Sequence, residues 1–230
     1  SDVCSSDLPS PSSPVDMLKP LGDSAILIQL GDAIDPILNQ RVHALSALLQ
    51  TIPAITETVP AYCTVLVHYD PLATTYNQIK NLIEEKISLL DESTHRPSRR
   101  LEIPVLYGNA SGPDLEPAAA TLALSPSELI RLHSEREYTV YMMGFTPGFP
   151  YMGILDERLT LPRLSTPRTR VPAGSVAVAG SQTGIYPVDS PGGWHIIGHT
   201  PLKLFDPLSE NPFLFAPGDK VKFVPIEGEH

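Results

Sequence analysis

A run of arginines without neighbouring acids is the strongest chemical signal in this sequence. Between Arg158 and Val188 there is no aspartate or glutamate, although the whole chain carries a formal net charge of −10. The arginines of this stretch are Arg158, Arg163, Arg168 and Arg170. Arginine presents a planar, permanently charged group whose paired N–H donors match a carboxylate or a phosphate. The stretch therefore predicts either an anion-binding wall or a solvated loop whose arginines pair with acids elsewhere on the surface.

Two histidines follow this stretch, His195 and His199, and either has the chemistry of a general acid or base near neutral pH. Their spacing of four would suit a shared metal ion on a helix, but the glycines and the proline around them disfavour a helix. On an extended strand they would share a face about 13 Å apart, because a strand rises about 3.3 Å per residue. That separation is too large for one zinc ion, so we predict no metal site. A purely structural role for both histidines remains the alternative.

The segment GFTPGFPYMG holds aromatic side chains on stiff turns. Phe145, Phe149 and Tyr151 are interspersed with glycines and with prolines such as Pro147. Aromatic residues held in this way line the rim of an apolar pocket or form a docking patch. Packing at the end of a barrel is the structural alternative, above all for Phe145.

The first part of the chain alternates strand and helix patterns. Apolar, β-rich runs occur at 24–30 and 62–70, and apolar residues recur at helical spacing over 38–49 and 76–90. Asp35 followed by Pro36 is typical of a helix start, with an N-cap residue and a proline at the first helical position. This order predicts a small α/β sandwich of about 80 residues. The polar, non-periodic stretch at 91–100 predicts a linker.

The second part of the chain becomes rich in turns. LEIPVLY predicts a strand, and two short helices follow it. Ser125 and Glu128 predict a capping box at the start of the second helix, and the helix dipole favours a histidine, His133, near its end. From Tyr138 on, short strands alternate with glycine and proline turns, which is typical of a closed or rolled β-structure. One of these strands, GSVAVAG, has tiny side chains on one face, which leaves room for a ligand or a packed helix.

Composition excludes several classes of protein. The net charge of −10 and the pI near 5.1 argue against a nucleic-acid binder, which would be basic. No apolar run approaches the roughly 18 residues of a membrane span. Two cysteines, Cys4 and Cys63, argue against a disulfide framework and favour a reducing, cytoplasmic location. Residues 1–16 are rich in serine and proline without an apolar segment, so we interpret them as a disordered leader, foreign or truncated, and not as a secretory signal.

Several motifs in this order resemble one known family. They are VHYDP, EIPVLYG, YTVYMMGFTPGFPYMGILDERLTLPR, PRTRVPAGSVAVAGSQTGIYPVDSPGGWHIIGHTPLKLFDP and PGDKVKFVPI. Together they resemble the B subunit of bacterial-type 5-oxoprolinase, a family also described as allophanate hydrolase subunit 1 and as the Kip-type inhibitor of sensor histidine kinases. The likeness runs from Leu18 to Ile226. It implies an α+β protein, with a small N-terminal α/β domain at 17–95 and a cyclophilin-like β-barrel domain at 96–230.

The resemblance also implies an activity and partners. Family members work with the 5-oxoprolinase C subunit, which has a related barrel fold, and with the A subunit, and the three open 5-oxoproline to L-glutamate at the expense of ATP. The chain has no P-loop, since GSQTG lacks the lysine that would reach a phosphate. We therefore expect a partner subunit to bind most of the ATP and the chain to be inactive alone. A module that inhibits a sensor histidine kinase, docking through the aromatic segment, and a subunit that acts on allophanate or another urea derivative are the alternatives.

Residue roles follow only from combining the resemblance with the chemistry. Arg163, Arg168 and Arg170 become candidate binders of an anionic substrate, with Gln182 and Tyr186 as hydrogen-bond donors. The turn that holds Ser190, Gly193 and Trp194 would form the mouth of the site, and His195 or His199 the acid or base. Phe145, Pro147, Phe149 and Tyr151 form the candidate interaction patch. His199 departs from the family, which usually has an arginine there, and a titratable group would hold an anion less firmly at neutral pH.

Overall fold

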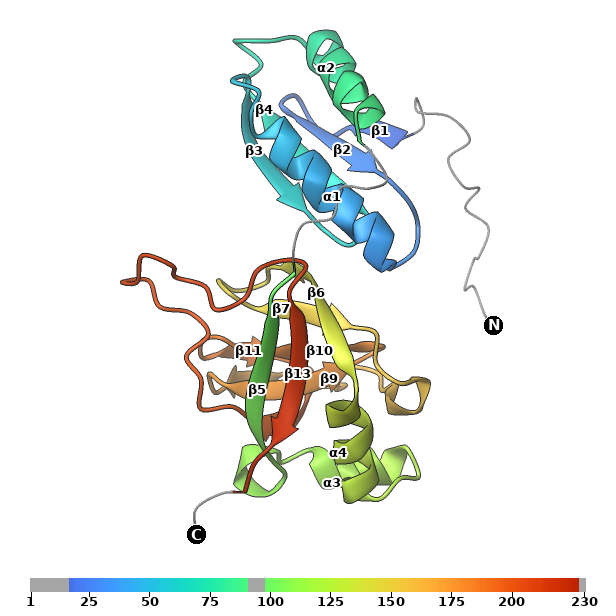
Figure 1. The fold of residues 1–230 in the computed structure, drawn as a ribbon, viewed down its shortest axis with the longest axis vertical. Coiled ribbons are helices and arrows are strands. Elements are labelled where there is room, and N and C mark those ends of the chain that lie inside the picture. The colour runs from blue at the N-terminus through green and yellow to red at the C-terminus, as the bar shows by residue number, and fades with distance from the viewer. Residues whose placement is uncertain (1–16, 91–97, 228–230) are drawn as a thin grey trace. The chain divides into compact units, whose positions relative to one another are not determined.

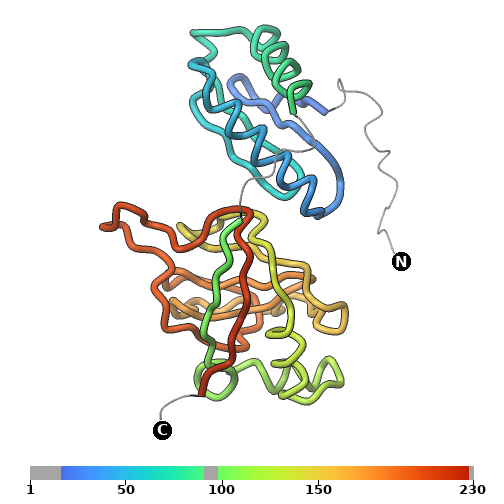
Figure 2. Tube along the Cα trace, in the orientation of Figure 1, coloured from blue at the N-terminus to red at the C-terminus, as the bar shows by residue number. Residues whose placement is uncertain are grey.

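A computed structural model describes residues 17–90 and 98–227 of the 230-residue chain. The chain divides into two compact units, one up to Arg96 and the other from Pro97 on. Both units are drawn as ribbons in Figure 1 and as a tube in Figure 2. The predicted leader at 1–16 and most of the predicted linker, 91–97, lie outside the described residues.

The first unit is a four-stranded antiparallel sheet whose helices cover one face (Figure 1). Its strands, in the order β1-β2-β4-β3, are β1 (Leu18–Pro20), β2 (Ala25–Gln29), β4 (Thr64–Tyr69) and β3 (Ile55–Pro60), and its helices are α1 (Pro36–Leu49) and α2 (Tyr76–Ser88). Side chains of both helices share one core with the strands, which places both helices on the same face of the sheet. The predicted α/β sandwich is confirmed, although β1 and β3 were not foreseen.

Local signals explain both helices of this unit. Asp35 accepts a hydrogen bond from the Leu38 amide at 2.8 Å, as an N-cap residue does. Thr75 begins α2 with a capping box that it forms with Gln78. The apolar stripe of α1 then buries Val42 fully against the sheet, so the helix gains most of its stability from tertiary packing.

Replacing Asp35 is expected to weaken this unit by a small, measurable amount. Asp35→Ala removes the acceptor of the Leu38 amide and should lower the free energy of unfolding by about 1 kcal/mol. Asp35→Ser keeps a capping oxygen, so its free energy of unfolding should fall by only a few tenths of a kcal/mol. Urea denaturation followed by circular dichroism measures the difference, and equal losses in the two variants would show that the cap is not the cause.

The second unit is a closed barrel with the strand order β10-β7-β6-β13-β5-β12-β9. Its strands are β5 (Arg100–Tyr107), β6 (Glu137–Met143), β7 (Pro150–Gly153), β9 (Ser175–Ala179), β10 (Gln182–Ile185), β12 (His195–His199) and β13 (Lys220–Pro225). The first and last of these strands, β5 and β13, lie side by side in parallel, as Figure 2 shows in green and red. The expected closed β-structure is therefore confirmed.

Two helices and a separate ribbon complete the second unit. The helices α3 (Leu115–Thr121) and α4 (Pro126–Glu135) lie together at one end of the barrel (Figure 1), next to the 3-10 turns η2 (Asn109–Ser111) and, near α4, η3 (Glu157–Leu159). Ser125 starts α4 by accepting a hydrogen bond from the Glu128 amide at 3.2 Å, which is one half of the predicted capping box. Outside the barrel, β8 (Arg168–Val171) and β11 (Ser190–Gly192) pair into a two-stranded ribbon.

His133 is buried inside the unit, which corrects its predicted role as a charged group at a helix end. Its Nδ1 lies 2.7 Å from the Tyr107 hydroxyl and its Nε2 lies 2.9 Å from Thr183 Oγ1. The Thr183 hydroxyl donates to the Ala177 carbonyl, so it accepts from His133 Nε2, and Nδ1 accepts from Tyr107. The ring is therefore neutral, and burial lowers the pKa of His133 to about 3.

Candidate functional site

The outer face of the barrel carries a second, aromatic core beside the ribbon. In β9, Val176 and Val178 point into the barrel, whereas Ala177 and Ala179 face this second core. The other members of the core are Phe149, Val171, Tyr186, Trp194 and Ile196. The small side chains of GSVAVAG thus make room for aromatic rings and the ribbon, and not for a helix. The core fixes β8 and β11 against the barrel.

Asp114 ties the turn before α3 to the ribbon and to β12. Its Oδ1 accepts a hydrogen bond from Arg168 Nη2 at 2.6 Å, and its Oδ2 accepts one from the Ile196 amide at 2.7 Å. The Asp114 amide donates in turn to the Ile196 carbonyl at 2.9 Å. Asp114 is the N-cap residue of α3, yet its side chain makes no hydrogen bond to that helix. The carboxylate therefore serves the ribbon and β12 instead of its own helix.

A concavity of about 390 Å³ lies where the η2 turn, the ribbon and β12 meet. Its lining residues are Ala110, Ser111, Pro113, Arg168, Arg170, Pro172, Ser175, Ile196 and His199. Two arginines, a histidine and two serines, one from η2 and one from β9, face this space. None of the lining side chains is acidic. We call it the arginine pocket. Its volume is near the lower end of the roughly 300–1,000 Å³ typical of ligand sites.

The four predicted arginines have different surroundings. Arg168 and Arg170 line the arginine pocket, whereas Arg158 and Arg163 do not. Arg170 is exposed and pairs with Asp189 at 2.6 Å. A hydrogen bond from the Ala173 amide and this arginine lower the pKa of Asp189. The acid-free stretch is therefore part pocket wall and part solvated surface, and anion binding by its pocket residues stays a prediction.

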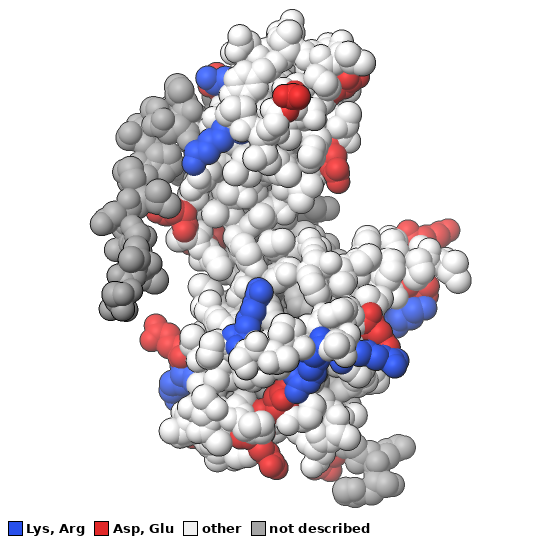
Figure 3. Space-filling view, turned by 180° about the vertical axis from the view of Figure 1, so that it is seen from behind, with Lys and Arg blue, Asp and Glu red and all other residues white. Residues whose placement is uncertain are grey.

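Arg158 and Arg163 belong to the solvated part. Arg158 binds Asp156 through Nε at 2.9 Å, and hydrogen bonds from Arg158 hold the pKa of Asp156 below its usual value. Arg163 is exposed. Figure 3 shows basic and acidic side chains next to one another on the face of the barrel unit seen from behind. The surface there is a mosaic of charges and not one broad basic patch.

The two histidines lie on a strand, as predicted, but they do not share a face. A bulge between Ile196 and Gly198 shifts the register, so that His195 lies opposite Val178 and His199 opposite Ser175. Side chains of residues that lie opposite each other point to the same face of a sheet. Val178 and Ser175 are three residues apart on a regular strand and point to opposite faces, so His195 and His199 do too. His199 lines the arginine pocket, whereas His195 lies against the Pro162 carbonyl, with Nε2 at 2.9 Å from the oxygen. The expected shared face is therefore wrong.

The predicted hydrogen-bond donors and the predicted mouth are part of the packed structure. Tyr186 and Trp194 are buried in the aromatic core, and burial raises the pKa of the Tyr186 hydroxyl. Ser190 is buried in the ribbon, and Gly193 follows it in a turn beside Pro167. Gln182 is half-buried in β10. None of these residues lines the arginine pocket, although Tyr186 lies close enough to Arg163 and Arg168 for both charges to act on the pKa of its hydroxyl.

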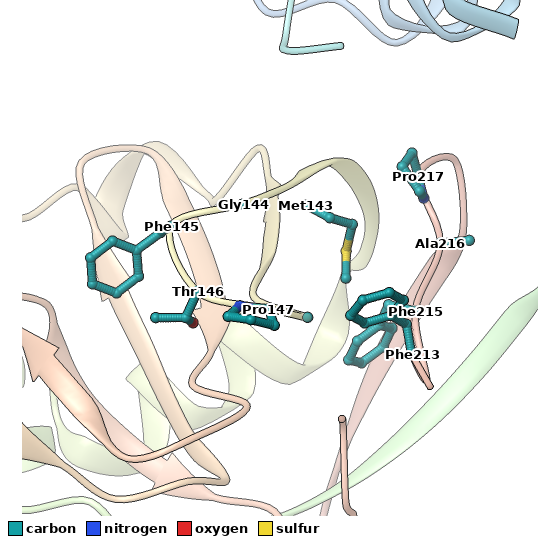
Figure 4. A pocket seen from close by; sticks show the side chains of 10 residues that line it. Met143, Gly144, Phe145, Thr146, Pro147, Phe213, Phe215, Ala216 and Pro217 are labelled. Carbon is teal, nitrogen blue, oxygen red and sulfur yellow. The ribbon is translucent and has the colours of Figure 1, made fainter. Parts of the chain in front are cut away.

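The candidate interaction patch divides into two groups. Phe145 and Pro147 are exposed and line a separate apolar concavity of about 500 Å³. Figure 4 shows Phe145 turned away from Phe213 and Phe215, with Pro147 between them. Phe149 and Tyr151 instead pack against Trp194 in the aromatic core. Phe145 still contacts Phe149 edge to face, with 5.8 Å between the ring centroids, but Phe149 is buried and adds nothing to the exposed surface of the patch.

The described ranges contain neither a metal-binding cluster nor a membrane-spanning helix. No group of three or more histidine, cysteine, aspartate or glutamate side chains within residues 17–90 and 98–227 is arranged to hold a metal ion. In the same ranges, no helix is long and apolar enough to cross a membrane.

Sequence reasoning missed the most connected residue of the site, Asp114. Its only sequence signal was an aspartate directly before a helical pattern, which predicts an N-cap and nothing more. The pairing with Arg168 spans 54 positions and depends on how the turn before α3 meets β12. Ser111 was also missed, because its place in the pocket lining depends on the same contact between the turn and β12.

Comparison with known proteins identifies the class of the chain and then its family. The family model of the carboxyltransferase domain, subdomain C and D, matches residues 17–215, so the chain is a carboxyltransferase-domain protein. It is 43% identical to the 5-oxoprolinase B subunit of Bacillus subtilis (strain 168), over 91% of this chain and 92% of that protein. To the protein of the same name from Escherichia coli O157:H7 it is 42% identical, over 89% of this chain and 94% of that one. The chain belongs to the family of 5-oxoprolinase B subunits.

The chain is also similar to a solved structure and to a more distant relative. The crystal structure of TTHA0988 matches with a TM-score of 0.79 and 40% identity, covering 89% of this chain and 40% of that one. The chain thus spans 40% of the length of that protein. A putative urea carboxylase of Emericella nidulans is 27% identical over 70% of this chain, which corresponds to 14% of its own length.

Proposed function

We propose that the chain is the B subunit of an ATP-dependent 5-oxoprolinase, a complex that opens the lactam of 5-oxoproline to L-glutamate. One observation carries the proposal. The chain is 43% identical to a 5-oxoprolinase B subunit over 91% of its own length and 92% of that protein. A match of this extent includes both units and leaves no large part of either chain unaccounted for.

The chain works in this proposal as one wall of a larger enzyme, together with the A and C subunits. In TTHA0988 the matching part makes up 40% of a longer polypeptide, which supports a function in company with further domains. The sequence has no P-loop, so ATP is bound mainly by a partner subunit. The chain alone is inactive.

The proposed reaction consumes one lactam, one ATP and two waters, and it yields glutamate, ADP and phosphate. The lactam oxygen attacks the γ-phosphorus of ATP and ADP leaves. Water adds to the activated carbon, the C–N bond breaks as the nitrogen takes a proton, and γ-glutamyl phosphate remains. A second water releases phosphate and completes glutamate. Such a sequence needs groups that hold anions and a group that moves protons more than it needs a strong nucleophile.

This chain supplies both kinds of group. Arg168 and Arg170 hold the anionic part of the substrate in the arginine pocket. His199 lines the same pocket, and its Nε2 lies 3.0 Å from the Ala173 carbonyl, which only accepts. That bond places the proton on Nε2 and leaves Nδ1 to take or give a proton. His195 makes the same kind of bond to the Pro162 carbonyl, but it lies outside the arginine pocket, so His199 is the histidine placed to act there.

Reconstitution tests the proposed function directly. The chain is co-purified with candidate A and C subunits, and ADP and glutamate are measured with and without 5-oxoproline. We expect equal amounts of both products, and their loss when the chain is left out. ATP turnover that does not depend on 5-oxoproline, or full activity without the chain, would contradict the proposal.

Action on a urea derivative is the second candidate, favoured by the 27% identity to the putative urea carboxylase. The same complex is incubated with allophanate in place of 5-oxoproline, and the release of ammonia is measured. Hydrolysis of allophanate to carbon dioxide and ammonia needs no ATP, so ammonia released from allophanate, with no 5-oxoproline-dependent ATP turnover, would establish the second candidate and remove the first.

A further inference from the structure

Arg168 is held in the arginine pocket in a fixed orientation. Its Nη2 is bound to the Asp114 carboxylate at 2.6 Å, and this carboxylate is itself anchored by the Ile196 amide at 2.7 Å. The Asp114 residue is only 8% exposed. The pair is partly buried, with 31% of the Arg168 side chain and 11% of the Asp114 side chain exposed. An ion pair anchored by an additional backbone hydrogen bond restricts a long side chain, so less freedom is left to lose when a ligand binds.

One guanidinium nitrogen of Arg168 has no partner. Arg168 Nη1 is buried and without a hydrogen bond, one of four such side-chain atoms in the part of the chain that the structure describes, and Ser190 Oγ, in the paired strand of the ribbon but outside the lining of the arginine pocket, is another. In the ribbon, Ser190 lies opposite the buried Val171 and Gly192 lies opposite Arg168. Both atoms therefore belong to the face of the ribbon that is turned toward the barrel. Buried donors without a partner are uncommon, and a water molecule or a ligand atom usually satisfies them, so Arg168 Nη1 has a hydrogen bond left to give.

The pocket suits a small oxyanion. Two arginines line it, no acidic side chain does, and the carboxylates that pair with them, Asp114 and Asp189, lie outside the lining. Arg168 keeps Nη1 free while Nη2 binds Asp114, and a guanidinium N–H donates to a carboxylate oxygen and to a phosphate oxygen alike. The substrate of the proposed reaction carries one carboxylate, which stays intact while the lactam opens, so it can hold the molecule in place throughout.

We infer that the arginine pocket binds the carboxylate of 5-oxoproline through Arg168, and that Asp114 is the positioning residue that orients Arg168 for it. The identity of the ligand rests on the proposed function, whereas the oxyanion subsite and the role of Asp114 rest on the contacts described above. Asp114 touches no substrate in this arrangement and acts only through Arg168.

Asp114→Asn tests the positioning role. An amide offers one acceptor where the carboxylate offers two, so either Arg168 or the Ile196 amide loses its partner. We expect the dissociation constant for 5-oxoproline, measured by calorimetry on the complex, to rise about 10- to 100-fold, as the loss of charged hydrogen bonds implies. KM should rise to match while kcat changes less than about threefold.

Three further variants make the experiment decisive. Arg168→Met should weaken binding at least as much as Asp114→Asn. The double variant Asp114→Asn with Arg168→Met leaves no unpaired buried carboxylate, so it keeps the test valid if a single variant fails to fold. Arg158→Met is the matched control, since Arg158 belongs to the same acid-free stretch but pairs with Asp156 outside the pocket. It should bind 5-oxoproline as the wild type does.

Inorganic phosphate is titrated alongside 5-oxoproline to distinguish the two sources of an oxyanion. Unchanged binding and KM in folded Asp114→Asn and Arg168→Met, in a complex that still turns over 5-oxoproline, would overturn the inference and leave the proposed function standing. Binding of phosphate alone, lost with Arg168, in a complex without 5-oxoproline-dependent turnover would remove the proposed function and confirm the subsite for another anion. A folded wild-type complex that binds neither would overturn the subsite.

Discussion

Gly112→Ala is expected to destabilise the barrel by more than about 4 kcal/mol, a loss that marks an exceptional position. A Cβ at residue 112 would lie 2.1 Å from the Ile197 carbonyl oxygen and 2.4 Å from its carbon. Both atoms belong to the backbone of β12, so no rotation of a side chain relieves the overlap. The turn must move away from the strand instead.

Moving this turn would also disturb the arginine pocket. The turn is attached to β12 by hydrogen bonds from the Gly108 amide to the Ile197 carbonyl and from the Asp114 amide to the Ile196 carbonyl, at 3.1 and 2.9 Å. Asp114 comes shortly after Gly112 in the same turn and holds Arg168. The absence of a side chain at residue 112 thus permits the close approach that brings Asp114 to the ribbon.

Gly193→Ala is the matched control for this prediction. The atoms nearest to its added Cβ would be those of Pro167, at 3.6 Å or more, which is ordinary contact. Urea denaturation of both variants gives the comparison, with the yield of folded protein as a second measure. A Gly112→Ala protein within about 1 kcal/mol of the wild type would show that the turn is more adaptable than its contacts indicate.

The elements that sequence reasoning predicted are those determined by neighbouring residues. The start of α1 depends on Asp35 and Pro36, and the start of α4 depends on Ser125 and a residue three positions later. Alternation in GSVAVAG correctly indicated a strand with one tightly covered face. These signals act over a few positions, so one sequence contains all the information that they need.

The features that escaped prediction depend on register between distant segments. The pair of Asp114 with Arg168 requires the turn before α3 to reach the ribbon. The bulge at Ile196 moves His195 and His199 to opposite faces, although their spacing alone implied a shared one. Burial of Trp194 likewise follows from the ribbon lying over the barrel. Periodicity along one segment contains no information on such contacts.

Acid is expected to destabilise the barrel through His133. Burial lowers the pKa of this histidine from 6.5 to about 3 in the folded chain, whereas the unfolded chain keeps the ordinary value. Between these two values the unfolded state binds a proton that the folded state does not, so stability is full above pH 6.5 and falls as the pH falls. The slope is about 1.4 kcal/mol per pH unit, which amounts to about 2 kcal/mol between pH 7 and pH 5.

The neutral form of His133 is also the one that the surrounding hydrogen bonds require. Tyr107 donates to Nδ1 at 2.7 Å, and burial raises the pKa of its hydroxyl, which keeps the donor proton in place. A proton on Nδ1 would face that donor, in an apolar setting where Phe223 stacks on the ring at 4.5 Å between centroids. Protonation therefore breaks a buried hydrogen bond in addition to placing a charge in the core.

Denaturation midpoints measured from pH 7 to pH 5 test this linkage. His133→Gln cannot titrate, so it should lose stability at pH 7, by about 2–4 kcal/mol, but should lack the extra loss of about 2 kcal/mol toward pH 5. His199→Gln leaves the buried ring in place and should keep the wild-type slope. Nuclear magnetic resonance of the wild-type ring provides a measurement that needs no variant. Since the folded ring takes up no proton until well below pH 5, a titration of His133 near pH 6 in the folded protein would show that it is not the source of the acid sensitivity.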